Sequence, residues 1–155
     1  MSIGLWVRGA RPKTLVTSIA SVMVGAVMAY VHIERSGTCI AIYPEPASCA
    51  TAREQQTLLM DRFWPVTILC LLVALFLQIA VNYANDYSDG IRGTDAGRDM
   101  DESKSGKPQR LTASGLVPAK HVLFAAMICA AIACICGVVA DRKEHTSELQ
   151  SQDLI

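Results

Sequence analysis

Charged residues are absent from three long stretches of the sequence, 15–32, 64–84 and 122–140. The stretches are almost wholly apolar, and about 20 apolar residues cross a bilayer as a helix. Helices of a soluble bundle would carry charges on their outer faces, so their absence argues against that class. The first stretch also lacks a small-x-small cleavage pattern, which favours a retained helix over a cleaved signal peptide. We therefore expect an all-α, polytopic transmembrane helix bundle with about three spans.

The six cysteines fall into two settings. Four lie within the apolar stretches, where they are expected to be small buried hydrophobes: Cys70, Cys129, Cys134 and Cys136. Cys134 and Cys136 have no partner histidines, which disfavours a metal site there. Cys39 and Cys49 lie between the first two spans, where an oxidising compartment would permit a disulfide. Their spacing alone does not establish that bond.

Basic residues are few between the first two spans, in the polar segment 33–63, which we expect to be an irregular loop. That segment holds three lysines and arginines, against nine in the segments before the first span and between the second and third. Because such an excess marks the cytoplasmic side, the N-terminus and the loop 85–118 are predicted to be cytoplasmic. The basic residues flank spans and acidic residues, so the lipid bilayer is an expected partner and nucleic acid is not.

A polar stripe runs down the second half of the second span. If the helix continues through Asp89, its members fall within one sector, because positions three and four apart stack on a helix. They are Gln78, Asn82, Asn85, Asp86 and Asp89. Polar and ionisable groups at membrane depth usually face a bundle interior and mark a functional site. The stripe therefore indicates a site, with Asn82 among its substrate-binding residues.

Carboxylates gather where this span ends. Asp89 and Asp95 are six residues apart with glycines between them, so a turn could bring both to one side. With Asp86 and Asn85 they form an oxygen-rich group of the kind that Mg²⁺ prefers, and Mg²⁺ commonly shares its ligands with substrate phosphates. A solvated, charge-balanced loop is the structural alternative, but such a loop does not require polar residues leading into the membrane.

Basic residues on the same side could neutralise a bound diphosphate. Lys104, Lys107 and Arg110 follow the aspartates, and an arginine can contact phosphate through two hydrogen bonds. Arg11 and Lys13 precede the first span; they either anchor that helix at the membrane surface or reach toward the same anionic ligand. A membrane cavity opening on a magnesium–diphosphate site would suit a lipid diphosphate, whose loss of diphosphate needs charge stabilisation.

The motif NDYSDGIRGTD, residues 85–95, resembles the first aspartate-rich motif of the UbiA superfamily of membrane prenyltransferases. The spacing from Asn85 to Asp89 to Asp95 is similar to that of the 1,4-dihydroxy-2-naphthoate polyprenyltransferase branch of menaquinone synthesis. The segments GARPKTL (9–15) and RLTASG (110–115) also resemble that branch. The resemblance covers about residues 6–140.

This resemblance implies a nine-helix, all-α membrane enzyme with two aspartate-rich motifs facing a central cavity. Asp89 and Asp95 would bind Mg²⁺–diphosphate, Asn85 and Asp86 would support them, and Arg110 would contact phosphate. The substrates would be a polyprenyl diphosphate and 1,4-dihydroxy-2-naphthoate, and the product demethylmenaquinone. We expect a bacterial cytoplasmic membrane protein with a cytoplasmic N-terminus.

The second aspartate motif of the family has no counterpart in the sequence, so residues 1–140 are expected to be the N-terminal part of such an enzyme and inactive alone. Residues 144–151, EHTSELQS, resemble a translated sequencing adapter. We therefore expect 141–155 to be a non-native tail, with a genuine hydrophilic C-terminus as the alternative. Two other functions stay open: a related prenyltransferase with another acceptor such as 4-hydroxybenzoate, and a membrane subunit that binds or transports cations.

Overall fold

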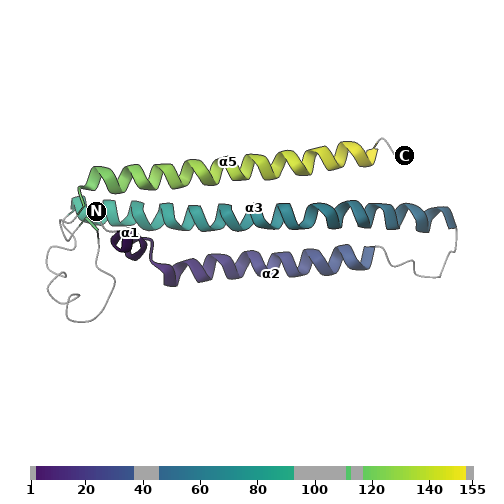
Figure 1. The fold of residues 1–155 in the computed structure, drawn as a ribbon, viewed down its shortest axis with the longest axis horizontal. Helices are drawn as coiled ribbons and strands as arrows, with labels where there is room; N and C mark the ends of the chain where they lie inside the picture. The colour runs from purple at the N-terminus through teal and green to yellow at the C-terminus, as the bar shows by residue number, and fades with distance from the viewer. Residues whose placement is uncertain (1–2, 37–45, 93–110, 113–116, 153–155) are drawn as a thin grey trace. The chain divides into compact units, whose positions relative to one another are not determined.

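A computed structural model describes the backbone of residues 3–36, 46–92, 111–112 and 117–152. Four α-helices account for nearly all of this backbone (Figure 1). They are α1 (Ile3–Gly9), α2 (Pro12–Ser36), α3 (Pro46–Arg92) and α5 (Ala119–Gln152). No strand occurs within these ranges, which confirms the prediction of an all-α fold.

Helices α2, α3 and α5 each contain one of the uncharged stretches, and each is long and apolar enough to cross a membrane. Many apolar side chains on them are exposed; Val24 and Met28 of α2, for example, are 66% and 68% exposed. Large exposed apolar surfaces are rare on soluble monomers but normal where lipid replaces water. The chain is therefore a multi-pass membrane protein.

Helix α3 is longer than the sequence led us to expect. Because α2 extends to Ser36 and α3 begins at Pro46, the prediction of an irregular loop over 33–63 is wrong for residues 33–36 and for residues 46–63. These residues lack an apolar period but are rich in alanine, arginine, glutamine and leucine, which favour helix, and proline suits a first helical position. At its other end α3 continues to Arg92, so Asn85, Asp86 and Asp89 lie on the helix itself.

The chain forms two compact units, and each of the three long helices contributes to both. Unit 1 comprises Met1–Ile19 and Val73–Ile135, and it contains every residue that is buried in the described part of the chain. Its apolar core consists of Ala10, Tyr83, Leu111, Val117, Val122 and Ala126. This core packs α1 and the first half of α5 against the second half of α3.

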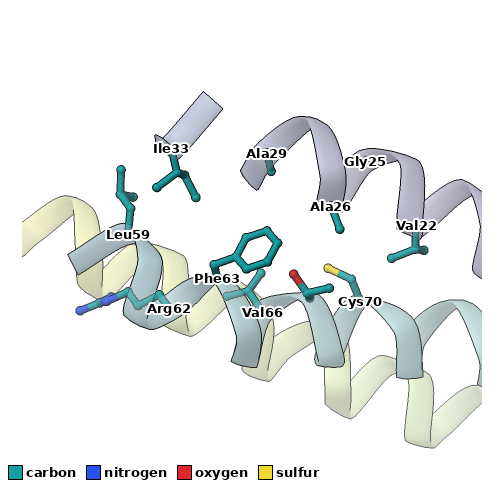
Figure 2. A pocket seen from close by; sticks show the side chains of 11 residues that line it. Val22, Gly25, Ala26, Ala29, Ile33, Leu59, Arg62, Phe63, Val66 and Cys70 are labelled. Atoms are coloured by element: carbon teal, nitrogen blue, oxygen red, sulfur yellow. The ribbon is translucent and has the colours of Figure 1, made fainter. Parts of the chain in front are cut away.

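Unit 2 comprises Ala20–Leu72 and Cys136–Ile155. Within it, α2 and α3 flank an apolar pocket of about 480 Å³ (Figure 2). Its walls include Val22, Ala26 and Ala29 from α2 and Phe63, Val66 and Cys70 from α3. Phe63 also contacts the rings of Tyr30 and Trp64 edge-on, at centroid distances of 5.6 and 5.2 Å. None of the predicted site residues lines this pocket.

The described cysteines are of two kinds, one disulfide-bonded and four free. Cys49 is disulfide-bonded, while Cys39 lies outside the described residues. Cys70, Cys129, Cys134 and Cys136 are free. They are exposed or half-buried rather than buried, so the expectation of buried hydrophobes is wrong for the chain alone. The reason is that these positions lie on helix surfaces that few other elements of the described chain cover.

Candidate functional site

The polar stripe of α3 lies in unit 1, but its members differ in exposure. Asn82 is 3% exposed and Asp86 is 2% exposed. These two residues are one helical turn apart, and both face the other elements of unit 1. Asn85 is exposed and Asp89 is half-buried. Asn82 and Asp86 are thus held within the protein, whereas Gln78, Asn85 and Asp89 are partly or fully exposed.

Asn82 holds the turn between α1 and α2. Its amide nitrogen donates to the backbone oxygen of Ala10 at 2.7 Å and to Thr14 Oγ1 at 2.9 Å. Its amide oxygen accepts a hydrogen bond from Gln78 Nε2, one turn earlier on α3, at 3.3 Å. Asn82, which was predicted to bind substrate, therefore fixes the turn formed by residues 10–14, called the corner below. Arg11 and Lys13 belong to this corner.

Arg11 lies in that corner in an unusual backbone conformation. Its φ is 53°, in the left-handed region that side chains other than glycine seldom adopt. Its carbonyl oxygen caps α2 by accepting from the backbone nitrogen and the hydroxyl of Thr14, both at 2.9 Å. The side chain of Arg11 is half-buried and that of Lys13 is exposed. Both residues belong to unit 1, as do Asn82 and Asp89.

Tyr83 is a further residue of this region that the sequence did not single out. It is buried, its hydroxyl donates to the backbone oxygen of Trp6 at 3.0 Å, and its ring meets the Trp6 ring edge-on at 5.6 Å. A buried tyrosine normally needs such a partner for its hydroxyl. A lone tyrosine next to Asn82 in an apolar span was the signal that could have indicated this contact.

Asp86 binds the backbone of the segment that follows the aspartate loop. Its Oδ2 accepts a hydrogen bond from the Leu111 amide at 2.8 Å, and Leu111 is fully buried. The side chain of Leu111 lies so close to Gly9 of α1 that a Cβ atom there would meet Leu111 Cγ at 2.8 Å. Residues 111–112 are therefore held between α1 and α3.

Glycine at position 90 permits a second close approach. A Cβ atom on Gly90 would lie 2.5 Å from Thr112 Cβ, which is closer than real carbon atoms approach. Glycines commonly break helices, yet Gly90 lies within α3 and lets Thr112 lie against the helix backbone. Glycine in a helix often marks such a backbone approach.

Asp95, Lys107 and Arg110 lie outside the described residues. In the described part of the chain, no group of three or more histidine, cysteine or acidic side chains could hold a metal ion. The carboxylates of the described residues fit, in their chemistry, a magnesium site that the protein shares with a substrate phosphate. Mg²⁺ commonly takes one or two carboxylates and completes its shell with water and phosphate. Asp89, half-buried on the last turns of α3, is the described carboxylate best placed for that role.

Known proteins similar to this chain come from one group. Over 138 residues, 89% of its length, the chain is 38% identical to a Mycobacterium tuberculosis protein named 1,4-dihydroxy-2-naphthoate octaprenyltransferase. Proteins of the same name from Mycobacterium leprae and Haemophilus influenzae are 34% and 30% identical over 88% and 76% of the chain.

These matches cover 36%, 35% and 28% of the three relatives, so the chain spans about a third of their length. No protein-family model and no solved structure matches the chain. The name of these relatives is that of the enzyme branch that the motif at residues 85–95 resembles. Over most of its length, the chain is homologous to the membrane prenyltransferases named 1,4-dihydroxy-2-naphthoate octaprenyltransferase.

Proposed function

We propose that this chain forms part of a prenyltransferase that moves a polyprenyl group from polyprenyl diphosphate to 1,4-dihydroxy-2-naphthoate, giving demethylmenaquinone. The observation that carries the proposal is the similarity, over 89% of the chain, to a protein named 1,4-dihydroxy-2-naphthoate octaprenyltransferase. The location of Asp89 supports it, because this carboxylate is partly accessible near the end of a membrane helix on which Asn82 and Asp86 are buried. The proposed location is a bacterial cytoplasmic membrane, with the N-terminus in the cytoplasm.

Asp89 and Asp95 would hold Mg²⁺, which when bound would neutralise charge on the departing diphosphate. Asn85, exposed one turn before Asp89, would orient the diphosphate through its amide. Lys107 and Arg110 would contact phosphate oxygens and stabilise the negative charge that develops as the bond to the prenyl carbon breaks. The prenyl carbon would then form a bond to the naphthoate ring, with the carboxylate of the acceptor lost.

Arg11 and Lys13 would assist from the α1–α2 corner. The corner is fixed to Asn82, seven residues before Asp89, which corresponds to about 10 Å along a helix axis. A long arginine or lysine side chain can cover much of that distance. In this proposal Asn82 supports diphosphate binding through the corner that it holds, because its amide is buried and hydrogen-bonded to Gln78, Ala10 and Thr14.

A chimera tests the proposed activity. The matching 138 residues of the Mycobacterium tuberculosis relative would be replaced by the corresponding residues of this chain. Membranes containing the chimera would be supplied with polyprenyl diphosphate, the naphthoate acceptor and Mg²⁺, and the prenylated product would be measured by mass spectrometry. We expect product formation that requires Mg²⁺ and that falls at least about a hundredfold in Asp89→Asn, a loss typical of removing one charge-stabilising group.

The control is Asp61→Asn, which removes an exposed carboxylate of unit 2 on the same helix. It should leave product formation unchanged. A chimera that inserts into the membrane but forms no product would contradict the proposed activity. Full activity of Asp89→Asn would contradict the role assigned to this carboxylate.

A further inference from the structure

The apolar pocket of unit 2 has a cation in its wall, and the proposed function uses neither the pocket nor the cation. Among the described residues that line the pocket, Arg62 is the one that carries a charge. Charged side chains are seldom found beside apolar cavities unless they have a partner of opposite charge. A cation beside an apolar cavity therefore fits a ligand with one anionic end and one apolar end.

The pocket extends along α3 into the uncharged part of the helix. Arg62 lies two residues before the uncharged stretch 64–84 begins, whereas Cys70 lies within that stretch. A separation of eight residues corresponds to about 12 Å along a helix axis. Figure 2 shows Arg62 beside Leu59, at the end of the pocket away from Cys70, with its guanidinium group directed away from Cys70. The positive charge thus lies at one end of the pocket, where the apolar stretch begins.

Aromatic side chains identify the level of the membrane at which this end lies. The Phe63 ring meets the rings of Tyr30 and Trp64 edge-on, at centroid distances of 5.6 and 5.2 Å. Trp64 is 62% exposed. Tryptophan and tyrosine are enriched where the lipid head groups lie. Arg62, directly before Phe63, is therefore expected at the depth of the head groups, and the rest of the pocket at the depth of the acyl chains.

The volume of the pocket favours an acyl chain over a helix. The pocket measures about 480 Å³. A helix with its side chains is about 10 Å or more across, so a 12 Å length of one occupies roughly 1,000 Å³. An acyl chain is far thinner, and the small side chains of Ala26 and Ala29 on α2 leave room for it against α3.

The chemistry of arginine favours a phosphate as the anionic end. A guanidinium group has several N–H donors in a planar fork that matches phosphate oxygens. Arg62 also interacts within the protein, but one such interaction does not use all of its donors. The neighbouring carboxylate, Asp61, is exposed and does not line the pocket.

We propose that the pocket of unit 2 is a binding site for an anionic phospholipid, with one acyl chain between α2 and α3 and the phosphate on Arg62. Basic pockets between membrane helices are known to hold anionic head groups. The inference goes beyond the proposed function and does not depend on it, because the pocket contains none of the residues assigned to prenyl transfer.

The test measures quenching of Trp64 fluorescence by brominated lipids. Trp6→Phe leaves Trp64 as the one tryptophan of the chain. The whole chain in this background is placed in phosphatidylcholine nanodiscs that contain a small fraction of either phosphatidylglycerol or phosphatidylcholine brominated on its acyl chains. Because lipids at the protein surface also quench an exposed tryptophan, the measured quantity is the preference for phosphatidylglycerol at equal mole fraction. We expect a preference of about fivefold, the effect of one cation near an anionic head group.

Two matched pairs of variants locate the bound lipid. Arg62→Gln should reduce the preference to less than about twofold, while Arg53→Gln, at an exposed arginine of α3 outside the pocket, should leave it unchanged. Ala26→Phe should fill the pocket and abolish the preference, while Val27→Phe, on an exposed side of α2, should not. Arg62→Lys retains the charge and should keep most of the preference, which tests the site even if Ala26→Phe fails to fold.

Equal quenching by the two lipids before any substitution at the pocket would overturn the proposal. A preference that survives Arg62→Gln would overturn it as well, because the phosphate would then not lie on this arginine. A preference that survives Ala26→Phe in a folded chain would place the lipid outside the pocket. Weak, equal quenching by both lipids in a chain that is dimeric in the nanodiscs would show that a second copy, and not a lipid, fills the pocket.

Discussion

Asn82→Ala should destabilise unit 1 more than any other single truncation on the polar stripe outside Asp86. The amide of Asn82 joins α3 to the α1–α2 corner through hydrogen bonds to Ala10 and Thr14. Its loss would leave the carbonyl oxygen of the buried Ala10 without its 2.7 Å partner. Leaving a buried polar group without a partner costs more free energy than an average hydrogen bond contributes to stability.

The size of the effect follows from two short hydrogen bonds. Hydrogen bonds between membrane helices contribute about 0.6 kcal/mol on average and up to about 1.7 kcal/mol each. Two of them give about 1–3 kcal/mol for Asn82→Ala. Asn85→Ala, a truncation of the same residue type at an exposed position three residues later, should change the free energy of unfolding by less than about 0.5 kcal/mol.

Tryptophan fluorescence provides the assay. The chain has two tryptophans, so Trp64→Phe leaves Trp6, whose ring packs on Tyr83 in unit 1, as the reporter. Unfolding in mixed micelles of increasing SDS content would be compared for this background with and without each asparagine substitution. If Asn82→Ala and Asn85→Ala shift the transition equally, the hydrogen bonds of Asn82 do not hold the corner and the argument fails.

Two other substitutions test the same corner. Gly9→Ala should destabilise unit 1 by about 1–3 kcal/mol because its methyl group would overlap Leu111. Gly25→Ala, where nothing lies within 4 Å, should be neutral or slightly stabilising in the same SDS titration; equal effects of the two would show that Leu111 does not approach Gly9. Arg11→Gly should be more stable than Arg11→Ala by about 1 kcal/mol, since only glycine adopts a φ of 53° without strain; the reverse order would contradict this backbone conformation.

Local composition was enough to predict the membrane helices. The three uncharged stretches lie within α2, α3 and α5, because apolar length alone decides whether a helix can span a bilayer. The part of α3 before Trp64 could not be predicted in the same way. Its residues favour helix only through propensity, a weaker signal than periodicity, and the prolines at its start suggested a loop.

The polar stripe shows that the sequence can group residues on one helix face without revealing which groups each of them contacts. Helical spacing correctly grouped Asn82 and Asp86 on one sector, and both are buried. Their partners, however, are backbone groups 72 and 25 residues away in the sequence, at Ala10 and Leu111. Backbone groups are present at every position, so no residue pattern reveals which of them a buried amide or carboxylate will find.

The same limit explains the glycines. Glycine commonly marks a turn or a helix end, and nothing in the local sequence shows that another segment approaches Gly9 or Gly90. Their actual role depends on Leu111 and Thr112, whose approach is set by tertiary packing. The contrast with Gly25, which has open space around it, could be recognised only from the structure.

The central claim is that Asp89 holds the metal of a magnesium–diphosphate complex at the end of α3. It is tested most directly by replacing Mg²⁺ with Mn²⁺ on the isotopically labelled chain in nanodiscs, with geranylgeranyl diphosphate present, and measuring paramagnetic broadening of backbone amide signals. We expect broadening to be strongest at residues 88–92, weak at Thr67 in unit 2, and lost in Asp89→Asn. Broadening that is uniform along α3, or that persists unchanged in Asp89→Asn, would contradict the account.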